Sequence, residues 1–294
     1  MKNNKSTILL IILLSLTTIL LTTFMVIMIN KKINLNFNFL YSQRIEELQI
    51  DKTYEYNFDK INIKSDASDI EIKQSENDNI SVKIYALKDT SSVTDNETEL
   101  NIDVKQKKCI GICINKKISK VELYIPENYE KEINIETNYG DIKISSFEKL
   151  NLNIKEDAGD INIEKANIVD INNNYGDIKI NEINNGVIKE SAGDIEINKA
   201  NNININNNMG DIKIEEINEY VEISGDAGDI KINNLNITKN SSIKTNAGDI
   251  KISNTNDIYI DSKTDIGDVK IRKNNKDAEI KLLIDNNLGD IKVN

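Results

Sequence analysis

The chain has 294 residues and a net charge of −11, with no histidine, no tryptophan, one proline and twelve glycines. Without histidine, zinc sites built on imidazole and Ser-His-Asp or Cys-His catalytic relays are excluded. The excess of 48 Asp and Glu over 37 Lys and Arg repels nucleic acid over most of the surface. We therefore expect no nucleic-acid partner.

An uncharged stretch of 22 residues runs from Ile8 to Ile29. A helix of that length spans about 33 Å, enough to cross a hydrocarbon core of about 30 Å. A cleaved signal peptide is the alternative, but it requires a shorter apolar region and a small-residue cleavage site, which residues 25–32 do not offer. We predict a cytoplasmic tail at 1–7, a single-pass membrane anchor at 8–29 and a juxtamembrane spacer at 30–58. The flanking lysines do not decide the orientation, and we expect the C-terminal part to be extracytoplasmic.

From Ile133 onward, a short phrase of the type AGDIKI recurs nine times, and its glycines are 17 to 22 residues apart. A nearly constant period of this size indicates stacked structural units. The nine pairs at the centre of the phrase are Gly140-Asp141, Gly159-Asp160, Gly176-Asp177, Gly193-Asp194, Gly210-Asp211, Gly228-Asp229, Gly248-Asp249, Gly267-Asp268 and Gly289-Asp290.

Apolar and polar residues alternate on both sides of each Gly-Asp pair, which is the pattern of a β-strand. In almost every unit, seven positions separate the last apolar residue before the pair from the first one after it, as between Ile135 and Ile142. Because seven is odd, a straight strand would expose one of the two apolar sets, so the chain must bend between them. Glycine suits a bend with positive φ, and the aspartate beside it can accept a backbone N–H. We place the bend, as a structural corner, at Gly-Asp.

These observations predict an all-β, single-domain β-solenoid of stacked coils over residues 59–294, with regular repeats over 133–294. An antiparallel sandwich is the alternative, because each unit could also fold as a hairpin. An eroded copy of the phrase at 67–72 places the start of the solenoid near Asp59. Residues 88–132 break the period, and we expect irregular first coils or a cap there.

Three features of the sequence carry a resemblance to a known family: the opening FDKINIKSDASDIEI (Phe58 to Ile72), the segment VELYIPENYEKEINIETNYGDIKI (Val121 to Ile144) and the serial GDI phrases. Together they resemble the bacterial putative-adhesin family of unknown function, carried by LiaG-like membrane-anchored proteins and LiaX-like envelope-stress proteins. The resemblance covers about residues 59–294. It implies a β-solenoid on the outer side of a Gram-positive membrane, in the cell envelope. It implies no agreed ligand or activity, so no functional residues are carried over.

The nine corner aspartates would form a ladder of carboxylates that repel one another unless they are compensated. Calcium could compensate them, but calcium-binding solenoids use several glycines in each short turn, which these units lack. Lysines that follow two residues after most of the aspartates could do so instead. We therefore expect structural corners with no metal and no other cofactor. The lysines are Lys143, Lys179, Lys213, Lys231, Lys251, Lys270 and Lys292.

The two cysteines, Cys109 and Cys113, lie four residues apart around Gly111. In a straight strand their Cα atoms would be about 13 Å apart, too far for a disulfide, whereas a tight turn at the glycine would let them form one. An extracytoplasmic location permits such a bond. Two unpaired cysteines remain the alternative.

Catalysis is not expected, because the chain has two arginines, Arg44 and Arg272, and aromatic residues make up only 5% of it. We expect Tyr139 and Tyr175 to stack inside the corner rather than to form a platform for a sugar. The sequence favours a membrane-anchored, non-catalytic module for surface binding or scaffolding, of the adhesin type. The alternative is an envelope-stress sensor or accessory protein that captures cationic peptides or other envelope ligands.

The printed sequence stops at Asn294, directly after the inward-facing Val293 of the ninth repeat. A coil without a cap presents unpaired backbone groups to which another strand can add. We therefore expect the C-terminal coil to pair with a protein or peptide partner, or with a second copy of the chain.

Overall fold

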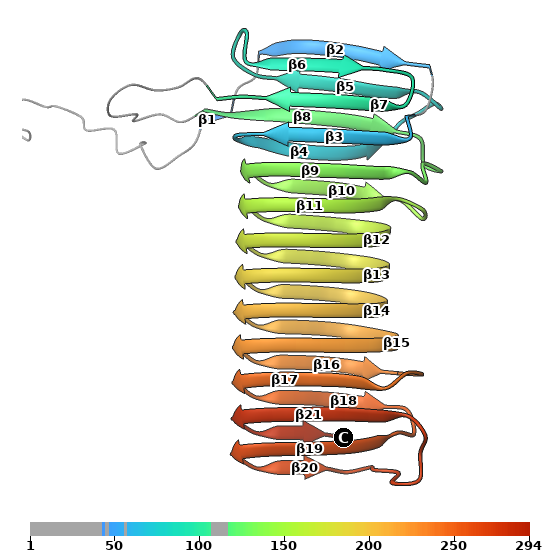
Figure 1. The fold of residues 1–294 in the computed structure, drawn as a ribbon, viewed down its shortest axis with the longest axis vertical. Helices are drawn as coiled ribbons and strands as arrows, with labels where there is room; N and C mark the ends of the chain where they lie inside the picture. Colours follow the sequence, from blue (N-terminus) through green and yellow to red (C-terminus); the bar gives the residue numbers. More distant parts are fainter. Residues whose placement is uncertain (1–42, 45–46, 56–57, 107–116) are drawn as a thin grey trace, which may run out of the picture. The chain divides into compact units, whose positions relative to one another are not determined.

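The computed structural model describes residues 43–44, 47–55, 58–106 and 117–294, and the strands described here lie in the unit Gln43–Asn294. The predicted β-solenoid is confirmed, because successive repeats pair as parallel strands in a stack of coils (Figure 1). The antiparallel sandwich is wrong for the same reason. The predicted anchor at 8–29, Cys109 and Cys113 all lie outside the described residues. Within the ranges given above, no helix is both long and apolar enough to span a bilayer.

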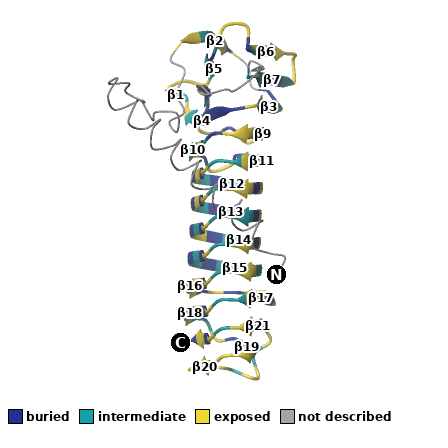
Figure 2. Ribbon diagram, turned by 90° about the vertical axis from the view of Figure 1, so that its left-hand side faces the viewer, coloured by how far each residue is buried: buried dark blue, intermediate teal, exposed yellow. Residues whose placement is uncertain are grey.

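The regular coils each run from one Gly-Asp corner to the next. Within the first of them, Ile161 and Ile163 are buried, and Val169 and Ile171 are buried further along, with Ala166 between the two pairs. The change of alternation around Ala166 marks a second bend, so each coil supplies two strand halves that face each other across a shared core (Figure 2). These coils are β12 (Ile161–Tyr175), β13 (Ile178–Ala192), β14 (Ile195–Met209) and β15 (Ile212–Ala227).

Shorter strands extend both sheets of the stack on either side of these coils. In these parts a coil is named by the two strands that flank its corner. Before the regular coils, β9 (Glu132–Tyr139) and β10 (Ile142–Ser146) form one such coil, and β11 (Asn151–Ala158) begins the next. On the other side follow β16 (Ile230–Leu235), β17 (Ser241–Ala247) and β18 (Ile250–Thr255). Their isoleucines and leucines join one continuous hydrophobic core.

At the N-terminal end of this unit, the order of the coils in space differs from their order in the sequence. The coil of β3 (Lys60–Ser65) and β4 (Ser68–Gln74) lies between β9–β10 and the pair β7 (Glu99–Val104) and β8 (Lys117–Ile125).

Antiparallel strands close this end of the stack: β2 (Leu48–Tyr54) and β8 flank β5 (Ile80–Tyr85), and β6 (Ser91–Asp95) pairs with β7. The short β1 (Gln43–Arg44) adds to β8. The segment that breaks the period thus supplies cap strands. Because β2 lies inside the stretch predicted as a spacer, the folded unit begins earlier than residue 59.

The C-terminal end shows a second exchange of order. The final coil, β21 (Lys281–Leu288) and β22 (Ile291–Val293), is inserted between β17–β18 and the coil of β19 (Tyr259–Ile266) and β20 (Val269–Ile271). The expectation that the coil ending at Asn294 forms the open end is therefore wrong, and β19–β20 is outermost (Figure 1). The composition of the two strands gives the reason. At the same inward position, β21 has the buried Ile284 and β19 has the polar Ser262. Exposure to water at the end of the stack costs less for serine than for isoleucine.

Candidate functional site

The nine Gly-Asp pairs stack directly above one another along one edge of the solenoid. A Cβ atom added to any of these glycines would overlap the backbone carbonyl of the adjacent coil. Seven of the nine also have positive φ, as Gly176 does with φ of 132°. A residue with a side chain therefore cannot occupy this position unless the neighbouring coil moves. At the C-terminal end the glycines stack in the order Gly248, Gly289 and Gly267, which is the same exchange of order as in the strands β17 to β22.

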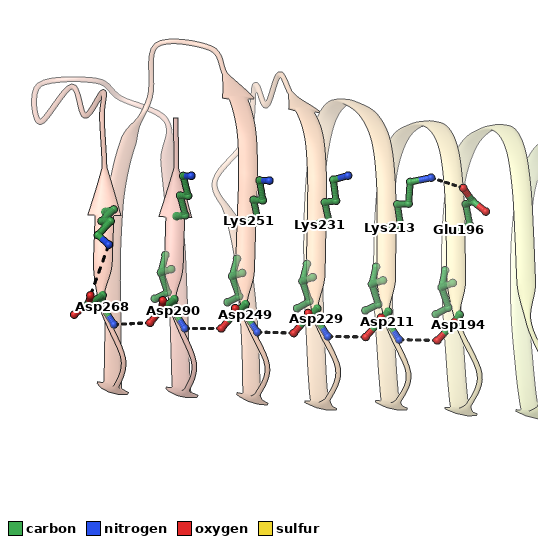
Figure 3. Close-up of a pocket in the computed structure, with 17 residues that line it drawn as sticks. Asp194, Glu196, Asp211, Lys213, Asp229, Lys231, Asp249, Lys251, Asp268 and Asp290 are labelled. Atoms are coloured by element: carbon green, nitrogen blue, oxygen red, sulfur yellow. Dashed lines mark hydrogen bonds and ion pairs between the residues drawn. The ribbon is translucent and has the colours of Figure 1, made fainter.

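The corner aspartates form a continuous hydrogen-bonded ladder (Figure 3). The backbone N–H of Asp211 donates to Oδ1 of Asp194 at 2.8 Å, and the same contact joins each successive pair. At the end of the stack, Asp290 N–H donates to Oδ1 of Asp249 at 2.8 Å and Asp268 N–H donates to Oδ1 of Asp290 at 2.9 Å. A hydrogen bond from a backbone N–H to a carboxylate oxygen is charge-assisted. The repulsion along the ladder is thus offset mainly by peptide groups.

A row of lysines runs parallel to the ladder, two residues further along each strand. Five of them stand in adjacent coils and pair residue to residue, in the order Lys213, Lys231, Lys251, Lys292 and Lys270. The predicted compensation between corner aspartates and these lysines is found, among the described residues, only at Lys270 and Asp268, 3.7 Å apart. Lys213 instead lies 2.6 Å from Glu196 and lowers the pKa of that carboxyl group.

Between the aspartate row and the lysine row lies a groove of about 680 Å³ that spans six coils, from Asp194 to Asp268. Its floor is the backbone of the strands, because the isoleucines there turn into the core. Adjacent coils are about 4.8 Å apart and the two rows are about 7 Å apart along the strands. The groove therefore presents one aspartate and one lysine per coil at regular intervals, except in the coil of Asp194, where Glu196 stands in the place of the lysine.

The residue before each corner glycine points to solvent, which corrects the prediction that Tyr139 and Tyr175 stack inside the corner. These tyrosines are 49% and 62% exposed, because the residues two places earlier, Thr137 and Asn173, occupy the inward position. Large and small residues alternate along most of this apolar ridge, which flanks the aspartate row on the side away from the lysines. In stack order the ridge is Tyr139, Ala158, Tyr175, Ala192, Met209, Ala227, Ala247, Leu288 and Ile266.

A column of inward-facing, mostly polar side chains lies directly behind the corner, three residues before each glycine. Several of them satisfy the corner carbonyls: Asn286 Nδ2 donates to Gly248 O at 2.9 Å, and Thr264 Oγ1 donates to Gly289 O at 3.0 Å. Hydrophobic alternation alone missed this column. The signal that could have found it is the absence of any apolar residue at this position in nine repeats. In stack order the column is Thr137, Glu156, Asn173, Glu190, Asn207, Gly225, Thr245, Asn286 and Thr264.

Two members of the column are buried carboxyl groups. Burial, followed by the negative charges of Asp141, Asp160 and Glu190, raises the pKa of Glu156 to about 8. Burial likewise raises the pKa of Glu190 to about 7, against the opposing hydrogen bond from the N–H of Ala192. Neither carboxyl oxygen of Glu156 has a hydrogen-bond partner within the part of the chain that the structure describes. In the next coil, the amide group of Asn173 donates a hydrogen bond to a corner carbonyl. A protonated Glu156 can donate to a corner carbonyl in the same way.

A second charged cluster braces the cap end. Lys120 and Lys73 lie 2.7 and 3.0 Å from Glu122, and both also contact Glu71. Burial raises the pKa of Glu122, but hydrogen bonds from the two lysines outweigh this effect and bring the pKa to about 2. Because the four side chains satisfy one another across β4 and β8, the cluster joins the two strands. Across the described ranges, no three acidic, cysteine or histidine side chains are placed to hold a metal ion together.

Comparison with known proteins gives two findings about this arrangement. The Toastrack DUF4097 family model matches residues 58–186 and again residues 181–294. The resemblance inferred from the GDI phrases is thereby confirmed. Among proteins with curated descriptions, none matches this chain.

Several solved structures are similar to the chain. A putative lipid-binding protein from Parabacteroides distasonis is 16% identical with a TM-score of 0.50, over 84% of this chain and 98% of its own. A putative adhesin from Bacteroides fragilis is 18% identical with a TM-score of 0.46, over 86% and 100%. A putative adhesin from Parabacteroides merdae is 13% identical with a TM-score of 0.46, over 85% and 98%. At these identities the likeness concerns the fold alone.

Proposed function

This chain belongs to the Toastrack family, and on that premise we propose that it is a non-catalytic binding module at the cell surface that holds an extended, zwitterionic polymer. The observation that carries the proposal is the groove between the aspartate row and the lysine row. An extended ligand in this groove would meet a carboxylate on one side and an ammonium group on the other at five of its six coils. A ligand that carries only one sign of charge would satisfy one row and be repelled by the other.

The proposed location rests on the sequence. The uncharged stretch 8–29 is long enough for a membrane anchor, and we propose that it holds the solenoid on the outer face of the membrane. One structure of similar fold is a putative lipid-binding protein, and a role at a surface agrees with that description of it. A parallel stack that keeps its charges at fixed intervals is suited to a polymer with repeating units.

The test compares three extended peptides of equal length: alternating Lys-Glu, poly-Glu and poly-Lys. Side chains alternate between the two sides of an extended strand, so the alternating peptide can present lysines to the aspartate row and glutamates to the lysine row. We expect it to bind the purified full chain in detergent at least about tenfold more tightly than either homopolymer. Isothermal titration calorimetry measures the affinities, and labelled peptide on intact cells that express the chain measures surface display.

The matching variant reverses three lysines of the groove that form no ion pair with any residue the structure describes, as Lys231→Glu, Lys251→Glu and Lys292→Glu. We expect it to weaken binding of the alternating peptide by at least about tenfold. The control makes the same change in net charge at three exposed lysines of the other sheet, as Lys155→Glu, Lys189→Glu and Lys244→Glu, and should leave binding unchanged. If both variants lose the same affinity, or if the wild-type chain does not prefer the alternating peptide, the proposal that the groove is the binding site is wrong. If the peptide binds the purified chain but not the cells, the proposed location of the solenoid on the outer face of the membrane is wrong.

A second candidate function has one observation in its favour. The exposed apolar ridge runs beside the aspartate row, with Tyr175 62% and Met209 58% exposed. A cationic amphipathic peptide could place its basic side chains on the aspartates and its apolar face on the ridge, as a sensor of such peptides would require. In this case a cationic amphipathic peptide binds more tightly than the alternating peptide. Tyr175→Ser with Met209→Ser then abolishes binding, and the lysine reversals do not.

A further inference from the structure

The outermost coil, β19–β20, is only half covered. The loop that follows it, residues 272–280, folds back over the beginning of β19: Asn274 Oδ1 accepts from Ile260 N–H at 2.9 Å and Asn274 Nδ2 donates to Ile260 O at 2.8 Å. Asn275 N–H donates to Ile258 O at 3.1 Å. The other half of the coil, from Ser262 to Ile271, has no further strand over it among the residues that the structure describes.

This uncovered half presents backbone groups that point away from the stack. Asp268 O accepts from Ile291 N–H and Arg272 N–H donates to Val293 O, both at 2.9 Å. Because the peptide groups of a strand alternate in direction, those of Val269 face the open edge. In β19 the peptide groups of Ile260 face the open side, toward Asn274, and by the same alternation those of Thr264 do too.

The hydrophobic core is also open here. Val269 is 42% exposed, whereas Ile291, which occupies the same position in the neighbouring coil, is fully buried. Ile266, at the end of the apolar ridge, is 67% exposed. An uncovered edge with exposed apolar side chains is the kind of surface that strand pairing buries.

The charges of this edge indicate which strand covers it. β19 carries Lys263 and Asp265 around Thr264, and β20 carries Asp268 and Lys270 around Val269. If two copies meet antiparallel about a two-fold axis through Thr264 and Val269, each lysine lies directly opposite an aspartate of the other copy. A parallel pairing in register would instead place like charges opposite one another, which destabilises a sheet.

One axis serves both strands. Thr264 and Val269 are the inward-facing residues next to the corner, one on each sheet, in register with Asn286 and Ile291 of the adjacent coil. They therefore face each other across the core, and a two-fold axis perpendicular to the sheets can pass through both. The edge is thus self-complementary in charge and in backbone direction, as an isologous interface requires.

We propose that two copies of the chain associate end to end through β19–β20, as an antiparallel pair that joins both sheets across the two molecules. The interface uses the open edge of the last coil, and it shares Asp268 and Lys270 with the end of the long groove. The lysines and aspartates that now contact each other along the same strand, at 3.3 Å for Lys263–Asp265 and 3.7 Å for Lys270–Asp268, gain partners on the second copy.

The experiment measures the mass of the purified full chain in detergent by sedimentation equilibrium over a range of concentrations. The wild-type chain should form a dimer. Charge reversal by Lys263→Asp and Lys270→Asp places four acidic groups opposite one another in each sheet, and should weaken the dimer at least about tenfold. The four-site exchange Lys263→Asp, Asp265→Lys, Asp268→Lys and Lys270→Asp restores every opposite pair, and should restore the dimer.

These variants share the N-terminal stretch, so any association through that part cancels in the comparison. Circular dichroism and the thermal midpoint show whether each variant is folded. Asp268 is the last carboxylate of the ladder, and its side chain accepts no hydrogen bond from a further coil within the described chain, so the exchange leaves the ladder intact. A wild-type monomer at all concentrations overturns the proposal. So does a dimer that the reversal does not weaken, or an exchange variant that stays as monomeric as the reversal.

Discussion

The corner carbonyls need a donor from inside the protein, and this requirement decides what can stand three residues before each glycine. Asn207 Nδ2 donates to both Gly193 O and Gly210 O at 3.2 Å, which shows how an amide in the column serves two coils. A carboxylate cannot donate, and an ionised one in a buried site is costly. Glu156 and Glu190 are therefore compatible with the column as neutral acids.

Replacing these two acids by amides should stabilise the protein at neutral and alkaline pH. Because burial raises the pKa of Glu156 to about 8 and that of Glu190 to about 7, the folded state keeps protons that the unfolded state loses above about pH 4.5. The contribution of these two acids to stability should thus be largest below about pH 4.5 and fall as the pH rises toward 8. Glu156→Gln with Glu190→Gln removes this loss and should raise the free energy of unfolding by about 1–3 kcal/mol at pH 8, with little change at pH 4.5. Denaturant titrations at the two pH values measure it.

The control for this prediction is Glu164→Gln, which neutralises an exposed glutamate on the same coils. It should not alter the dependence of stability on pH. If the wild-type protein and the double variant lose the same free energy of unfolding between pH 4.5 and pH 8, the two acids are not neutral in the folded state.

At the scale of the elements, ladders of hydrogen-bonded side chains hold the coils in register at the second bend, away from the Gly-Asp corner. At the second bend, Asn184 Nδ2 donates to Asn167 Oδ1 at 3.0 Å and Asn201 Nδ2 donates to Asn184 Oδ1 at 3.1 Å. Such ladders give the many asparagines of the chain a structural role. They also make neighbouring coils nearly interchangeable, because an asparagine donates to and accepts from an identical residue above and below.

The inserted position of the last coil in the sequence can be tested by comparing two residues in register. Ile284 in β21 is fully buried between β17 and β19, whereas Ser262 in β19 lies at the end of the stack. Ile284→Ala should lower the free energy of unfolding by about 2–4 kcal/mol, because it leaves a cavity with coils on both sides. Ser262→Ala should change it by less than about 0.5 kcal/mol. Denaturant titration of both variants measures the difference, and a small effect of Ile284→Ala would place β21 at the end instead.

At the scale of the whole chain, the sequence predicted the corners well and the order of the coils poorly. The odd spacing between Ile135 and Ile142 leaves a strand only one way to bury both residues, so the bend follows from counting. The order of the coils cannot be counted in this way, because β22 (Ile-Lys-Val) offers β18 the same alternation of apolar and polar residues that β20 (Val-Lys-Ile) would offer. The buried column was missed because a pattern of apolar residues cannot show which polar residues turn inward. That depends on the carbonyl groups they meet.

A stack of this kind should lose structure from its open end. Stability in a solenoid is close to a sum over contacts between neighbouring coils, so a coil with two neighbours is held more firmly than one with a single neighbour. Hydrogen exchange followed by mass spectrometry should therefore find the slowest amides in β12 to β15 and the fastest ladder amides in β19 and β20. The antiparallel strands at the other end should slow exchange in β7 and β8, because they cover that end as a further coil would. Exchange at one uniform rate along the stack would mean that the coils unfold as a single cooperative unit and that the open end has no lower stability than the middle.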